Sequence, residues 1–265
     1  MPRKTTLGFT LLELSVVLFI MALIVGGILT GRTMIQNAKL TQTINQMTDI
    51  QQAVSNFRDQ YHGYPGDLKN AATVLPTING IAPVSGNGDG YIGTPGYNNI
   101  DLDSPGFYGE RAQFFTQLGL AGFTQLYDPT SLVPGVGFPA PPLHPATGMI
   151  AGTEWGSTTN WSNMSGLVNF AQDPMYLFIG VCKPSALDTD STYDDCAIFT
   201  PLETQQIDTK LDDGLPLSGK ILAPSQSTIC ALGTQVGTSP NPVTNSYDLT
   251  SKVPGCNILY SLVNL

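Results

Sequence analysis

The sequence predicts an α+β protein with a long N-terminal α-helix, membrane-spanning in its first half and amphipathic in its second, packed on a loop-rich globular domain with a small antiparallel sheet. Three observations support this fold class. The run 9–29 is apolar except for Glu13, and apolar residues recur at helical spacing from Leu40 to Tyr61. Most of the 28 Gly and 20 Pro follow residue 62, between short apolar runs.

Composition limits the classes of function. The chain has 265 residues, 42% of them hydrophobic, which is enough for a sizeable core. The net charge is −9, and basic residues do not cluster beyond Arg3 and Lys4, so a basic footprint for nucleic acid is missing. We therefore expect no binding to nucleic acid.

The first apolar segment has the length of a membrane span. Its 21 residues, at about 1.5 Å each, match a hydrocarbon core about 30 Å thick. Arg3 and Lys4 precede it without an acidic residue, which favours a cytoplasmic N-terminus. The run exceeds the apolar core of a secretory signal, and no A-x-A cleavage site follows it. We expect a single-pass anchor at about 9–29.

The helix is expected to continue to residue 61 as an amphipathic segment. Gly63 is expected to take a left-handed cap, and Pro65 forbids continuation. Gly26, Gly27 and Gly31 weaken the middle of the helix and predict local bending or melting there during packing. The apolar positions that should face the globular domain are Leu40, Ile44, Met47, Ile50, Val54, Phe57 and Tyr61.

The start of the chain carries a specific motif. A short basic leader, "MPRKTTLG", ends in Gly8 and is followed by "FTLLE" and the apolar run. This resembles the type IV pilin and type II secretion pseudopilin family. The resemblance implies that prepilin peptidase removes the leader 1–8 between Gly8 and Phe9 and methylates the new N-terminus at Phe9. It leaves the helix 9–61 and a globular domain over 62–265, and it makes Glu13 the fifth residue of the product.

Glu13 needs a partner, because a carboxylate in hydrocarbon costs several kcal/mol unless it is paired or protonated. The cationic α-amine of Phe9 is the expected partner. The resemblance implies that this amine belongs to a neighbouring subunit, so that assembly relieves the cost and fixes the register of the filament. The alternative is a Glu that merely lies close to the lipid headgroups.

The globular domain is expected to contain two helices and three strands. The first helix covers 110–122, and the second covers 200–214, with Pro201 in its first turn and Gly214 past its end. Strands are expected at 175–182, 219–223 and 256–263, and the Gly- and Pro-rich stretches 76–110 and 132–148 are expected to be loops.

The four cysteines predict two disulfides and an oxidising compartment. Four cysteines allow three pairings, and proximity in the sequence favours Cys182 with Cys196 and Cys230 with Cys256. Each bridge is expected to add about 2 to 4 kcal/mol of stability.

No cofactor is required by the sequence, but two acidic groups suggest a structural calcium ion. Asn87, Asp89, Asp101 and Asp103 offer hard oxygen ligands on a Gly-rich loop, although their register does not fit an EF-hand. The alternative is a loop in which these side chains cap local backbone. Asp208, Asp212 and Asp213 form a weaker candidate, better interpreted as a solvated helix face.

Catalytic motifs do not support an enzyme. His62 and His144 stand outside any metal-ligand spacing, so a buried or turn-capping role is expected for both, and no G-x-S-x-G elbow is present. "GVGFPA" at 135–140 fits a dinucleotide pattern only formally, since Pro139 is in it and no strand precedes it.

The function expected from the resemblance is a structural subunit of a type IV pilus or pilus-like filament. Its partners would be copies of itself or other pilins, prepilin peptidase, the inner-membrane assembly platform and, before assembly, membrane lipid. The globular domain would lie in the periplasm and, after assembly, on an extracellular filament. The alternatives are a type II secretion pseudopilin and a membrane-anchored binding protein or adhesin.

Overall fold

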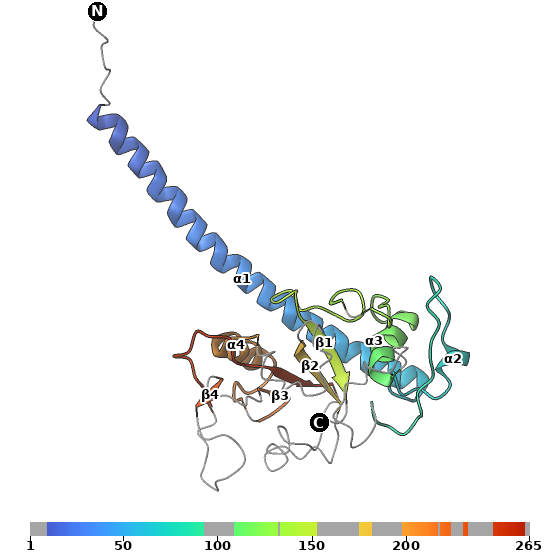
Figure 1. Ribbon diagram of the computed structural model, residues 1–265. Helices are drawn as coiled ribbons and strands as arrows, with labels where there is room; N and C mark the ends of the chain where they lie inside the picture. Colours follow the sequence, from blue (N-terminus) through green and yellow to red (C-terminus); the bar gives the residue numbers. More distant parts are fainter. Residues whose placement is uncertain are drawn as a thin grey trace, which may run out of the picture.

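The computed structural model describes residues 10–92, 109–131, 133–152, 175–181, 198–216, 218–223, 230–232 and 246–262. One long helix, α1, runs through the molecule, and the remaining elements pack along its second half (Figure 1). The first half projects away from them. This is the α+β architecture that the sequence predicts.

Helix α1 spans Leu11–Tyr61, which is 51 residues and about 76 Å at the standard rise. It is continuous through Gly26, Gly27 and Gly31. The bending predicted there concerned packing into an assembly and stays a prediction. The helix ends at the predicted residue, but the left-handed residue after it is His62, with φ 55°, and not Gly63. Gly63 is therefore not the cap, which corrects the sequence-based expectation.

Three further helices belong to the globular domain. The short helix α2 spans Ala71–Val74 and was not predicted. Helix α3 spans Glu110–Leu120, as predicted to within two residues. The helix α4 spans Pro201–Leu211, and Pro201 is at its first turn as predicted. Thr200 and Glu203 close a capping box at the start of α4, in which each side chain bonds the other residue's backbone N–H.

The main sheet is antiparallel and has the strand order β1-β2-β6-β3. Its strands are β1 (Gly148–Gly152), β2 (Tyr176–Val181), β6 (Ile258–Ser261) and β3 (Ile221–Leu222). The last three lie inside the predicted strand ranges, whereas β1 begins where the sequence predicted the end of a loop. A second, two-stranded sheet joins β4 (Ala231–Leu232) to β5 (Ser246–Tyr247).

The core lies between the second half of α1 and the main sheet. Every apolar position predicted to face the domain is buried except Tyr61, which is partly buried and packs against the core. The Gln51 side chain bonds the final strand twice: its Nε2 donates to the Ser261 carbonyl over 3.3 Å, and its Oε1 accepts from the Tyr260 hydroxyl over 2.6 Å. These bonds join α1 to β6 across more than 200 residues of sequence.

A buried amide fixes the chain after α1. Gln117, on α3, is fully buried, and its Oε1 accepts from the Gly66 N–H over 2.7 Å while its Nε2 donates to the Val84 carbonyl over 2.7 Å. Gly66 has φ 90°, and a Cβ there would lie 2.4 Å from the Glu110 carbonyl oxygen. The position therefore requires glycine.

One of the two predicted disulfides is present, between Cys230 and Cys256. Both cysteines are fully buried, and the bridge holds the chain before β6 to the start of β4. The other predicted pair, Cys182 with Cys196, lies outside the described residues.

Candidate functional site: the exposed half of α1

The first half of α1 has an apolar surface that the domain does not cover. From Thr10 to Lys39 every residue is exposed except Gly31, which is partly exposed, and the first buried residue is Leu40. This part of α1 has a mean hydropathy of 2.6 over its most apolar 18 residues, and none of that window is buried. It is long and apolar enough to cross a membrane.

Glu13 lies at the start of this exposed segment and bonds the end of its own helix. Its carboxylate accepts from the Thr10 backbone N–H over 2.9 Å and from the Thr10 hydroxyl over 3.0 Å. In return the Thr10 hydroxyl oxygen accepts from the Glu13 N–H over 3.2 Å. Glu13 and Thr10 thus form a capping box, which satisfies backbone donors that the first turn leaves without partners.

Thr10 is a site residue that the sequence reasoning missed. The pattern T-x-x-E in front of an apolar run is the usual signal for a capping box, and "TLLE" at 10–13 fits it. The expected partner of Glu13, Phe9, lies outside the described residues, as does Gly8. The pairing of Glu13 with an α-amine therefore stays a prediction, and Thr10 is an additional partner within the chain.

The first candidate calcium loop is only partly described, because Asp101 and Asp103 lie outside the described residues. In the described part, the Asn87 and Asp89 side chains accept from the backbone N–H groups of Asp89 and Tyr91, over 2.8 and 2.9 Å. This is the backbone-capping arrangement that the sequence analysis gave as the alternative.

Asp67 organises the same loop, and the sequence reasoning missed it. Its buried carboxylate accepts from three successive backbone N–H groups, those of Gly88, Asp89 and Gly90, over 2.6 to 3.1 Å. The backbone of the loop thus wraps around an anion supplied by the chain itself.

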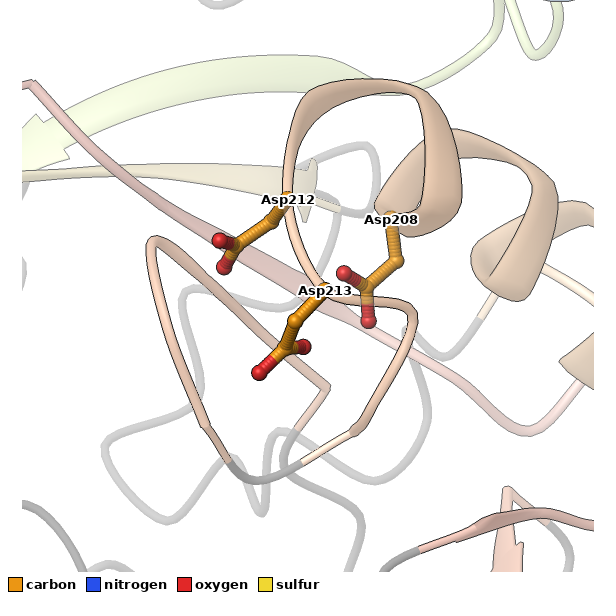
Figure 2. Close-up of side chains that lie close together, drawn as sticks. All are labelled: Asp208, Asp212 and Asp213. Carbon is orange, nitrogen blue, oxygen red and sulfur yellow. The ribbon is translucent and has the colours of Figure 1, made fainter.

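The second acidic group gathers at the end of α4 (Figure 2). Oxygens of Asp208, Asp212 and Asp213 lie within 4.8 Å of one another. Each carboxylate is already bonded to the turn that follows: Asp208 accepts from the Gly214 N–H, Asp213 from the Leu215 N–H, and Asp212 from two N–H groups at the start of β3. Carboxylate oxygens are ligands that calcium prefers, but here they hold the turn between α4 and β3 by accepting hydrogen bonds from its backbone N–H groups.

The interpretation of this group as a solvated helix face is wrong for Asp208. Its side chain is fully buried, and its Oδ2 accepts from the Tyr247 hydroxyl over 2.6 Å. Burial is the largest cause that raises the pKa of Asp208, which stands at about 6. Hydrogen bonds from Tyr247 and Gly214 lower this pKa, and the negative charges of Asp213 and Asp212 raise it. Burial also raises the pKa of the Tyr247 hydroxyl.

The two histidines have structural positions. His62 is the left-handed cap of α1, as the turn-capping expectation requires. His144 is partly buried, stands edge-on to the Phe199 ring, and lies 3.5 Å from the Glu203 carboxylate. Glu203 in turn closes the capping box of α4, so this pair belongs to the packing of that helix.

Comparison with protein-family models, curated proteins and solved structures gives no match to this chain. The resemblance at the N-terminus therefore depends on the residues around Gly8, Phe9 and Glu13 and on the apolar run that follows them.

Proposed function

We propose that this chain is a structural subunit of a type IV pilus or pilus-like filament. It is inserted in the inner membrane, cleaved after Gly8, methylated at Phe9, and assembled through α1 with copies of itself or with other pilins. The observation that carries the proposal is one continuous helix, with a bare apolar half that follows the processing motif and a second half that holds a globular domain.

The exposed surface requires a partner. Sixteen large apolar side chains are exposed between Leu11 and Ile35, and burying each of them is worth about 1.5–3 kcal/mol. A surface of this kind does not stay in water. Lipid covers it before assembly, and the helices of neighbouring subunits cover it in the filament.

Glu13 is compatible both with the single subunit in lipid and with the assembled filament. In lipid, Thr10 supplies two hydrogen-bond donors, which reduce the cost of holding the carboxylate in hydrocarbon. In the filament the α-amine of a neighbouring Phe9 adds an opposite charge. Membrane insertion is then tolerable for the single subunit, and assembly is favoured.

The N-terminus of the protein tests the first step. Mass spectrometry of protein purified from cells with prepilin peptidase should find N-methylated Phe9 as the first residue, leaving 257 of the 265 residues. In cells without the peptidase the chain should start at Met1. A chain that keeps Met1 in both strains would be the membrane-anchored binding protein or adhesin instead.

Glu13→Ala tests the second step. We expect the variant to insert and to form the Cys230–Cys256 bridge but to give no filaments by electron microscopy. Ser15→Ala is a matched control, because Ser15 is a second polar residue of the same segment and bonds only the Leu12 carbonyl of its own helix. Normal filaments from Glu13→Ala would contradict the pairing. The location of wild-type filaments, on the cell surface or confined to the periplasm, separates the pilus from the type II secretion pseudopilin.

A further inference from the structure

Four charged side chains of α1 are exposed and have no charged or hydrogen-bonding partner among the residues that the structure describes. Arg32 and Lys39 lie between the apolar half and the domain, and Asp49 and Asp59 lie on the half that carries the domain. In the described part of the chain none of the four forms an ion pair or a side-chain hydrogen bond. Arg58, by contrast, is held over the Tyr64 ring at 4.5 Å.

The bases and the acids lie on opposite faces of α1. At about 100° per residue, Arg32 and Lys39 continue the face of the buried stripe, within about 50° of its centre. Asp49 and Asp59 lie about 130° and 150° from that centre in opposite senses, so both are on the side turned from the domain, about 80° apart. The bases thus point toward the side on which the domain sits, and the acids point away from it.

We propose that a second copy of this chain docks the outer face of its α1, at Asp49 and Asp59, on Arg32 and Lys39 of the first copy. The inference rests on the proposed function and adds the contact and the stagger between two subunits. This geometry fits a filament. The domain does not cover α1 before Leu40, and in the filament the outer face of the next subunit's α1 covers this bare stretch on its domain side.

The spacing of the charges fixes one stagger. Arg32 and Asp49 are 17 residues apart and Lys39 and Asp59 are 20 apart, or about 25 and 30 Å along the helix. The difference of about 4.5 Å is within the reach of long basic side chains. A single displacement of the second copy by about 25–30 Å, toward the N-terminal end, therefore pairs both acids with both bases.

Other displacements are less favourable. A shift of about 15 Å sets Lys39 against Asp49 but leaves Arg32 and Asp59 without an opposite charge, so it forms one pair instead of two. The pairing of Glu13 with Phe9 spans four residues, about 6 Å, so it involves a different neighbour. With a net charge of −9 per chain, contacts that place bases against acids also reduce the repulsion between copies.

Cysteine cross-linking in filaments of the full-length protein reads the stagger directly. We expect Arg32→Cys/Asp49→Cys and Lys39→Cys/Asp59→Cys to give disulfide-linked ladders after mild oxidation, because the paired Cα atoms must come within about 7 Å. The matched control Lys39→Cys/Asp49→Cys requires a shift of about 15 Å and should give monomer only. Ladders from the control, or none from the two test pairs, would overturn the proposal.

Charge reversal tests the contact itself. Lys39→Asp alone and Asp59→Lys alone should each lower filament yield about tenfold, and the double variant should return it to within about twofold of wild type. Because both positions are exposed, the level of membrane-inserted protein and the Cys230–Cys256 bridge should not change. Wild-type yield from both single variants would refute this contact. Wild-type protein that keeps Met1 and forms no filaments would instead refute the proposed function.

Discussion

The buried carboxyl of Asp208 should make the stability of the domain depend on pH. Its pKa rises from the ordinary 3.8 to about 6 in the folded protein, so the folded state binds the proton more tightly than the unfolded state. Stability from this group is complete below pH 3.8 and is lost as the pH rises through 6. The shift of about 2 units corresponds to about 3 kcal/mol of unfolding free energy.

Asp208→Asn isolates this effect from the other carboxylates. Asn cannot ionise, and its carbonyl and amino groups can still bond the Gly214 N–H and the Tyr247 hydroxyl, which accepts as well as donates. We expect the unfolding free energy of wild type relative to Asp208→Asn to fall by about 3 kcal/mol between about pH 3.5 and pH 7.

The assay is urea unfolding of the full-length protein in detergent, followed by circular dichroism at several pH values with EDTA present. Asp59→Asn, which changes an exposed carboxyl on α1, should follow wild type at every pH. If the difference between wild type and Asp208→Asn stays constant across this range, the raised pKa is refuted.

Three further outcomes are expected, the first two from the same urea unfolding assay and the third from thermal unfolding with and without EDTA or calcium. Replacing Cys230 and Cys256 by Ser should cost about 3.5 kcal/mol for a loop closed by a sequence separation of 26, and an unchanged urea midpoint would show that the bridge adds nothing. Gln117→Ala should cost about 2–4 kcal/mol, because it leaves buried backbone groups unpaired, whereas Gln52→Ala on the exposed side of α1 should cost little. EDTA should not change the melting temperature, because the Asn87 and Asp89 side chains already accept hydrogen bonds from backbone N–H groups. A rise in the melting temperature on adding calcium would favour the calcium site instead.

Local signals predicted the three longer helices well and missed only the short helix α2 among the described helices. The periodic apolar positions of α1 and the Pro65 that follows it set the end at Tyr61. Pro201 and Gly214 bracketed α4 in the same way, because proline and glycine impose backbone geometry through their own chemistry. The exact cap was less predictable: both His62 and Gly63 can follow the last turn, and the left-handed conformation fell on His62.

Features decided by distant residues were not predictable. Strand β1, "GMIAG", has little strand propensity of its own and exists through pairing with β2, about 30 residues later. Asp208 was expected on a solvated helix face, and it is buried, with its carboxylate bonded to the Tyr247 hydroxyl of β5. At the candidate site, the apolar run and Glu13 were evident, while the role of Thr10 required attention to a three-residue spacing.

Helix α1 is divided into an apolar half that is exposed and a second half that packs on the domain. Among the described residues, the core uses α1 from Leu40 onward and Gln51 bonds α1 to β6, so the described core takes no contact from the exposed half. In the proposed filament, the apolar surface before residue 40 would exchange lipid for neighbouring helices without a cost in domain stability. Because α1 is continuous from Leu11 to Tyr61, a register set at Glu13 in the proposed filament would place the domain at a fixed displacement along the helix. Changes at Glu13 and changes in the core should accordingly act independently, the first on assembly and the second on folding.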